Sequence, residues 1–354
     1  IAHSIHALLK ATHCKRFVVM KLPNSAIFVG MLAMLQISYA YAQDTLQIGY
    51  FNEWPLPAHY GQTSGAYDEM LGAKTNWQSF ENSTAMFAAL ETGDIQIALS
   101  QGVVPFLLVA TAGLKFDIVD IAVSYPDSEN CVVHSDLGFS ASKTSVLVGK
   151  TIGLPIGTTA HFNLLRQLDH LKISTASLKL VHMSPAQAAA ALRQKNVDVA
   201  CGWGPALSEM LTMGEPLTSG DQKLQLGGGN FDVITIRASF GADNPETVAQ
   251  FLKVTASLNA SFTANPAHMI AGIAGQANMT ESTTNSSMAG FRFPTISEKA
   301  GPVWFGGGVQ AYLKNLADFL ALQGTIDKAL SSYDIYIDAS YLQSAAELPL
   351  VPSE

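Results

Sequence analysis

The chain has 354 residues, of which 48% are apolar and 14% charged, so it can bury a core large enough for two domains. Four of its 20 basic residues and none of its 28 acidic residues lie in 1–42, which leaves 16 basic against 28 acidic residues and a net charge of −12 for 43–354. This charge argues against nucleic acid as a partner, because phosphate binding needs clustered Lys and Arg.

Residues 1–42 are interpreted as an N-terminal extension and signal peptide that is removed. Lys21 makes a short basic start, residues 26–37 are mostly apolar, and a small-x-small cleavage site ends at Ala42. We therefore expect cleavage after Ala42 and export to the periplasm. The alternative is an uncleaved anchor, although the apolar run is shorter than the roughly 20 residues that span a bilayer. The sequence indicates no role for residues 1–19.

Two stretches of the exported part are nearly the same, 102 residues apart. Residues 88–102 read AALETGDIQIALSQG and residues 190–204 read AALRQKNVDVACGWG. Each ends a helix with Ala-Ala-Leu, crosses a polar link and enters a short strand. Further pairs of predicted strands precede them, at 46–51 and 151–156 and at 75–80 and 178–183. One such step could recur by chance, but three strands at similar offsets favour two similar α/β lobes with a cleft between them.

The order of predicted elements assigns residues 43–124 to lobe one, in which strands and helices alternate. This order favours a mainly parallel sheet flanked by helices. The polar, turn-rich segment 124–130 is the expected crossing between the lobes. Lobe two then covers residues 125–240, and we place the strand FDVITIRAS (231–239) in it.

Residues 241–354 contain no further strand–helix repeat, so we expect a C-terminal helical segment that packs back on the lobes. Residues 245–264 are amphipathic and predict one long helix. The segment 276–288 is rich in Ser, Thr and Asn and predicts a loop.

Two cysteines remain after removal of the leader, Cys131 and Cys201, each in a predicted strand of lobe two. An even count in an oxidising compartment and neighbouring strands permit a disulfide between them. Two buried free thiols are the alternative. Their spacing is not that of a metal site, and no motif in the chain predicts a metal or a cofactor.

A ligand is expected at the carboxyl ends of the strands, in the crevice where strand-to-helix loops meet. In lobe one, the loop Asn52-Glu53-Trp54 sets an acid beside an indole, which can hold an ammonium group by charge pairing and cation–π contact. A surface carboxylate and a core tryptophan are the alternative. Ser100 and Gln101 follow the third strand and could bind oxygens, or could simply cap the next helix.

In lobe two, Gly157 precedes Thr158 and Thr159 at the start of a predicted helix, with His161 two residues further on. Unpaired N–H groups, hydroxyls and the helix dipole at such a place favour an anion. Ordinary capping explains the threonines equally well. His161 could add a donor or lie on the helix surface.

Three more residues complete the predicted site. Trp203 stands between two glycines and is expected to face the cleft, and Asp232 begins a strand and could supply a second carboxylate or be a solvated turn acid. Tyr125 could join Trp54 and Trp203 in an aromatic cage for a quaternary ammonium group. Carboxylates and aromatic rings for a cation, and a helix N-terminus for an anion, together suit a small zwitterion.

Catalysis is not expected. Cys201 and His161 could be imagined as a nucleophile and its base, but a cysteine inside a strand usually packs, and the chain has no G-x-S-x-G or H-E-x-x-H motif.

From about residue 46 to residue 340, the chain resembles the periplasmic substrate-binding proteins of taurine and aliphatic-sulfonate ABC importers. The matching stretches are, in order, ALETGDIQIALSQG, IGTTAHFNLLRQLDHLKI, VACGWGPALSEM, FDVITIRASFGADNPETVAQFLK and GGVQAYLKNLADFLALQG. The resemblance implies a two-lobed, type II periplasmic-binding-protein fold that closes on its ligand and docks to a membrane permease. It also implies that the region of Thr158, Thr159 and His161 faces a sulfonate, and that Asp232 faces an amine.

The loop at 52–54 departs from the family pattern, which leaves the ligand open among taurine, other small sulfonates, nitrate and pyrimidine precursors of thiamine. A plain alkanesulfonate would leave Glu53 and Asp232 unpaired, and a buried unpaired carboxylate is costly. We therefore predict a monomeric receptor for taurine or a similar amino-sulfonate. The alternatives are a receptor for another osmolyte, a quaternary ammonium compound or a thiamine-pyrimidine-like ligand, and a secreted enzyme on the same fold.

Overall fold

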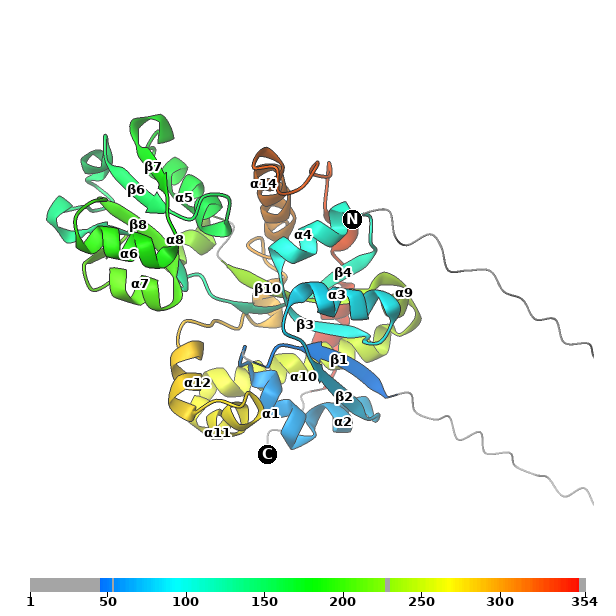
Figure 1. The fold of residues 1–354 in the computed structure, drawn as a ribbon. Helices are drawn as coiled ribbons and strands as arrows, with labels where there is room; N and C mark the ends of the chain where they lie inside the picture. Colours follow the sequence, from blue (N-terminus) through cyan, green and yellow to red (C-terminus); the bar gives the residue numbers. More distant parts are fainter. Residues whose placement is uncertain (1–44, 53, 227–229, 350–354) are drawn as a thin grey trace, which may run out of the picture. The chain divides into compact units, whose positions relative to one another are not determined.

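The computed structural model describes residues 45–52, 54–226 and 230–349, which form two five-stranded sheets with helices on their faces (Figure 1). The predicted leader, its cleavage after Ala42 and the predicted site residue Glu53 lie outside the described residues. Within the described ranges, no helix is both long enough and apolar enough to span a bilayer.

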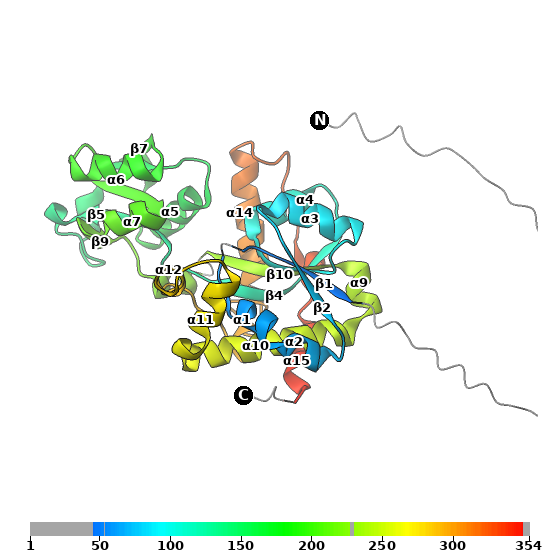
Figure 2. The ribbon, with the colours of Figure 1, turned by 60° about the horizontal axis from the view of Figure 1, so that its bottom comes forward.

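The first sheet has the strand order β2-β1-β3-β10-β4, and only β10 runs against its neighbours. Its strands are β1 (Leu46–Tyr50), β2 (Thr75–Ser79), β3 (Ile97–Gly102), β4 (Phe116–Ser124) and β10 (Phe231–Arg237). The connecting helices are α1 (Pro57–Ser64), α2 (Ala66–Leu71), α3 (Ser83–Thr92) and α4 (Val103–Thr111). Helices α3 and α4 cover one face, and α1 and α2 lie on the other (Figure 2).

The second sheet has the order β7-β6-β8-β5-β9, and again one strand, β5, runs against the rest. Its strands are β5 (Glu129–His134), β6 (Thr151–Leu154), β7 (Lys179–His182), β8 (Val199–Trp203) and β9 (Gly214–Pro216). Its helices are α5 (Thr159–His170), α6 (Pro185–Arg193), α7 (Gly204–Met210) and α8 (Gly220–Gln225). Both sheets are thus mainly parallel and flanked by helices, which confirms the predicted fold class.

The two similar stretches of sequence fold into corresponding parts of the two sheets. The order β2-β1-β3 matches β7-β6-β8, and Gly49 pairs with Ala98 as Gly153 pairs with Ala200. A Cβ atom on Gly49 would lie 2.6 Å from Ile95, and one on Gly153 would lie 3.5 Å from Val197. Ile95 and Val197 are themselves 102 residues apart. The glycines of β1 and β6 thus lie beside the same position of the repeat, but the side chain that a Cβ would crowd is Ile95 in the first sheet and Met183, at 2.9 Å, in the second.

The strand FDVITIR lies in the first sheet, and not in the second lobe where its position in the chain had placed it. It forms β10, antiparallel between β3 and β4. The chain therefore crosses to the second sheet between Ser124 and Glu129 and returns before Phe231. A strand that is buried along nearly its whole length has no polar face to show which sheet it joins.

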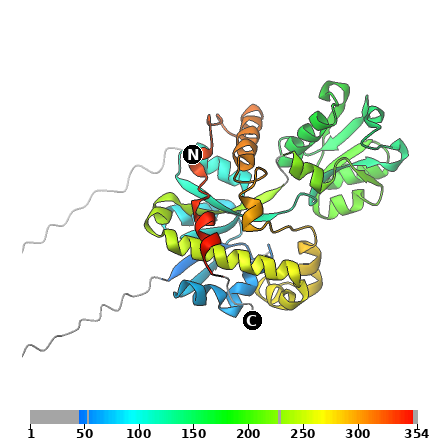
Figure 3. The same ribbon diagram turned by 180° about the vertical axis from the view of Figure 1, so that it is seen from behind.

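The C-terminal part is helical and packs mainly on the first sheet. It contains α9 (Ala238–Asp243), α10 (Pro245–Ala264), α11 (Pro266–Gln276), α12 (Glu281–Met288), α13 (Ile296–Lys299), α14 (Gly308–Leu322) and α15 (Ser340–Glu347). Helix α10 matches the predicted long helix and joins the core on the α1 side of the sheet (Figure 3). In α14, Phe319 contacts Phe162 of α5, so this part also touches the second lobe.

The predicted loop at 276–288 is wrong, because most of it is α12. Thr280 caps this helix by accepting a hydrogen bond from the N–H of Thr283, and Thr284 donates back to the carbonyl of Thr280. Met288 and Thr284 are buried. Hydroxyl residues are poor helix formers on their own, so burial and capping decide the outcome here.

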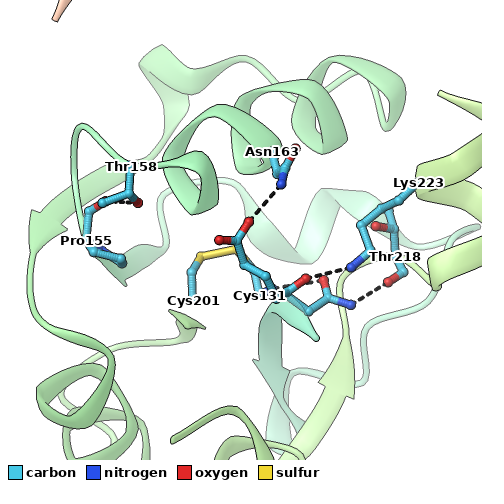
Figure 4. The surroundings of a disulfide bond; sticks show 9 residues. Cys131, Pro155, Thr158, Asn163, Cys201, Thr218 and Lys223 are labelled. Atoms are coloured by element: carbon cyan, nitrogen blue, oxygen red, sulfur yellow. Dashed lines mark hydrogen bonds between the residues drawn. A yellow bond between two sulfur atoms is a disulfide. The ribbon is translucent and has the colours of Figure 1, made fainter. Parts of the chain in front are cut away.

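Cys131 and Cys201 form a disulfide, which was one of the two expectations (Figure 4). They face each other on the neighbouring antiparallel strands β5 and β8 and lie in the core of the second lobe. The bond also removes the Cys201 thiol as a possible nucleophile.

Candidate functional site

A cavity of about 1050 Å³ lies where the ends of β3, β5 and β8 meet α5, α7 and α12. Four of the predicted site residues line it, namely Trp54, Tyr125, Thr159 and Trp203. The cavity takes its wall from both lobes and from the C-terminal part.

Asp232 is one of two buried acids at this site. Its carboxylate accepts a hydrogen bond from the Tyr125 hydroxyl at 2.7 Å and another from the Ser100 hydroxyl at 2.8 Å. Burial raises the pKa of Asp232 to about 6, against the opposing effect of these two hydrogen bonds. Tyr125 is part of the cavity wall, so Asp232 places a carboxylate directly behind that wall.

Ser100 is held in a strained conformation that aims it at Asp232. Its φ is 63°, in the left-handed region that residues with a side chain rarely adopt, and the pairing of β3 with β10 shifts register beside it. Such bulges turn a side chain away from its regular direction and occur next to functional sites. The neighbouring Gln101 is fully buried, and neither atom of its amide has a partner among the described residues.

Aromatic rings cluster beside the Tyr125–Asp232 pair. The ring centroid of Trp54 lies 5.3 Å from that of Tyr125 and 4.8 Å from that of Phe291, and all three line the cavity. Trp203, which is 41% exposed, adds another ring to the wall. Ring faces next to a carboxylate are the surroundings in which proteins hold an ammonium group.

The N-terminus of α5, which we expected to hold an anion, already faces a carboxylate that the sequence analysis missed. Glu129 accepts hydrogen bonds from the Thr159 hydroxyl at 2.9 Å and from the Asn163 amide at 2.7 Å, and it lines the cavity. Burial raises the pKa of Glu129, and its hydrogen bonds to Asn163 and Thr159 oppose that rise. A Glu129 proton could be donated to an anion, whereas an ionised Glu129 would repel it.

Thr158 and His161 lie near this helix start but are not part of the cavity wall. The Thr158 hydroxyl donates to the carbonyl of Pro155 at 2.7 Å (Figure 4). His161 accepts a hydrogen bond from the N–H of Gly157 and packs edge-on against Phe319, and burial lowers its pKa. Both contacts shape the turn before α5.

Asn52 is not part of the cavity wall either, and its side-chain amide donates a hydrogen bond to the backbone carbonyl of Ala277 at 3.4 Å.

Glu129 and Phe291 were missed for different reasons. Glu129 begins β5, and Asp232, which was predicted, follows the first residue of β10; these are the strands that run against their sheets. The beginning of an antiparallel strand lies at the edge where the parallel strands end, so strand starts as well as strand ends reach the cavity. Phe291 comes from a coil after α12, and nothing in its local sequence points to a site.

No protein-family model matches the chain. The taurine-binding periplasmic protein of Escherichia coli (strain K12) is 26% identical over 81% of this chain and 89% of that protein. A protein of Bacillus subtilis (strain 168) named for binding aliphatic sulfonates is 25% identical over 52% of this chain and 55% of that protein.

Among solved structures, the aliphatic sulphonate binding protein SsuA from Escherichia coli aligns with a TM-score of 0.60 at 19% identity, covering 82% of this chain and 95% of that one. The desulfurization enzyme DSZB aligns with a TM-score of 0.54 at 15% identity, covering 86% of this chain and 99% of that one. The predicted resemblance and fold are therefore confirmed. Because DSZB has this fold too, the fold alone does not separate a receptor from an enzyme.

Proposed function

We propose that this chain, a homologue of periplasmic taurine- and aliphatic-sulfonate-binding proteins, is the solute-binding component of an ABC importer. In this role it captures taurine or a similar amino-sulfonate in the 1050 Å³ cavity, in the periplasm, and delivers it to a membrane permease. The observation that carries the proposal is the buried Asp232 carboxylate behind Tyr125, in a cavity that also receives the N-terminus of a twelve-residue helix, α5.

The cation half of the ligand is assigned to the aromatic cluster. Trp54, Tyr125 and Phe291 offer ring faces and edges within one wall, and Asp232 adds negative charge that water screens poorly because it is buried. An ammonium group set there would be paired, and the energetic cost of ionising Asp232 in the apolar interior would fall.

The anion half is assigned to the helix starts. The first-turn N–H groups of α5 have no acceptor within the helix, and Thr159 at its first position lines the cavity. Gly102 and Val103, at the start of α4, line it too. A sulfonate near α5 would favour the protonated form of Glu129, whose pKa burial already raises.

Glu129 also supports a second candidate. With two buried carboxylates and several aromatic rings, the cavity has more features for a cation than for an anion. A receptor for a quaternary ammonium osmolyte would use the same rings without needing an empty helix N-terminus.

Calorimetry with taurine, hypotaurine, ethanesulfonate and glycine betaine tests the proposal. We expect taurine to bind at least about tenfold more tightly than ethanesulfonate, which lacks the ammonium group. Tighter binding of ethanesulfonate would sink the assignment of the cation half, and a preference for betaine would select the second candidate. Asp232→Asn should weaken taurine binding, whereas Asp243→Asn, at an exposed position in α9, should not.

A further inference from the structure

A second cavity, of about 650 Å³, lies between α10, α13 and α15 and shares no wall residue with the first. Figure 3 shows α15, in red, lying against the long yellow-green helix α10. Nothing in the proposed transport function uses this cavity.

Its walls form an aliphatic slot. Ala256 and Ala260 stand one turn apart on α10, and Leu342 and Ala346 stand one turn apart on α15. Residues spaced by four share one face of a helix, so each helix presents an apolar strip to the cavity, flanked by Ser257 on α10 and Gln343 on α15. The ring of Phe305 also borders it.

One cation lies in this apolar wall. Lys253, on α10, is only 7% exposed, and no hydrogen bond or ion pair of its ammonium group is found among the described residues. Lys299, which is also buried, differs because its ammonium group pairs with Asp120 at 2.7 Å. The nearby Glu298 carboxylate is engaged by the backbone and hydroxyl of Thr295.

An ammonium group that reaches the open cavity without a protein partner offers its charge to an anion that enters. We infer that this cavity binds an amphiphilic anion, with one carboxylate or sulfonate head on Lys253 and an unbranched hydrocarbon tail along the slot. The Ser297 hydroxyl, also on the wall, can donate to the head. The apolar strips of α10 and α15 would cover the tail, which supplies the hydrophobic part of the affinity.

Calorimetry on the full chain with octanoate, octanesulfonate, octanol and octyltrimethylammonium tests the inference. We expect saturable binding of at least one anion, with octanol at least about tenfold weaker and the cation weaker still. Lys253→Met keeps the aliphatic stem and should abolish the preference for an anion over octanol. Lys328→Met, at an exposed site, is the matched control and should leave the preference intact.

A second variant separates loss of charge from loss of fold. Ala260→Phe keeps Lys253 but fills the slot, and it should remove octanoate binding while the melting temperature shows a folded protein. Trp203→Ala alters only the first cavity and should leave octanoate binding unchanged. The inference is overturned if neither anion binds saturably, if Lys253→Met keeps the preference, or if Trp203→Ala removes the binding instead.

Discussion

Taurine binding should weaken as the pH falls through the pKa of Asp232. With that pKa at about 6, the carboxylate is nearly all ionised at about pH 8 and only about a tenth ionised at about pH 5. Taurine keeps both its charges over this range. If the ionised carboxylate holds the ammonium group, the dissociation constant should rise about tenfold, which is about 1.4 kcal/mol, between these pH values.

Protonation of Asp232 does not itself destabilise the folded state. The pKa of Asp232 is raised from 3.8 to about 6 by burial, so the folded state binds the proton more readily than the unfolded chain. This group therefore adds stability as the pH falls through about 6, and its contribution is fully present below the unfolded value. A loss of affinity at about pH 5 that Asp232 causes would therefore have to arise at the site.

Calorimetric titrations from about pH 5 to about pH 8 make the measurement, with ethanesulfonate as the matched ligand. Ethanesulfonate has no ammonium group, so its affinity should stay level or rise as Asp232 takes up a proton. Asp232→Asn should bind taurine weakly with a flat pH profile. Glu129→Gln should keep the loss of taurine affinity at low pH or steepen it, because this variant cannot regain anion binding on the α5 side by taking up a proton. Parallel profiles for the two ligands, or an unchanged slope in Asp232→Asn, would refute the reasoning.

Three further predictions concern the scaffold. Replacing Cys131 and Cys201 by serine should lower the free energy of unfolding by about 2–4 kcal/mol in urea titrations, and the idea fails if reduction leaves the wild-type midpoint unchanged. Ser100→Gly should be about 1 kcal/mol more stable than Ser100→Ala, because both lose the hydroxyl and only glycine relieves the positive φ; equal melting temperatures would argue against strain. Gly49→Ala should lower the melting temperature more than Gly153→Ala. The new Cβ at 49 would lie 2.6 Å from a methyl group of the branched Ile95, whereas the new Cβ at 153 would lie 2.9 Å from the sulfur of Met183, which can move. The reverse order of melting temperatures would contradict this.

The part of the fold that was predictable from sequence is the part that repeats. Three strand pairs at similar spacing predicted two similar, mainly parallel lobes, and both sheets share the partial order that the structure shows, β2-β1-β3 and β7-β6-β8, because local patterns determine strands and short crossovers keep successive strands close. The sheet that β10 joins depends on a pairing across more than a hundred residues, which no local pattern encodes. The helix α12 was missed because its stability comes from a cap and from tertiary burial.

The candidate site was also predicted only in part, because local sequence patterns do not encode long-range pairing. Trp54, Thr159 and Trp203 follow strands that were predicted, and they line the cavity. Glu129 and Phe291 were missed, because one begins an antiparallel strand and the other reaches the cavity from the C-terminal part. Whether these side chains bind a ligand stays a prediction.

The segment that crosses between the two sheets, residues 125–129, also sets the spacing of charge in the cavity. Tyr125, which donates to one buried carboxylate, and Glu129, which is the other, stand at the two ends of a stretch of only five residues. Because β5 pairs with β8 in a defined register, adding one residue to this stretch must either displace Tyr125 from Asp232 or turn Glu129 to the opposite face of its sheet. The length of the link is therefore as much a determinant of the cavity's charge as the acids themselves, and a change there could alter the ligand without altering any acidic residue.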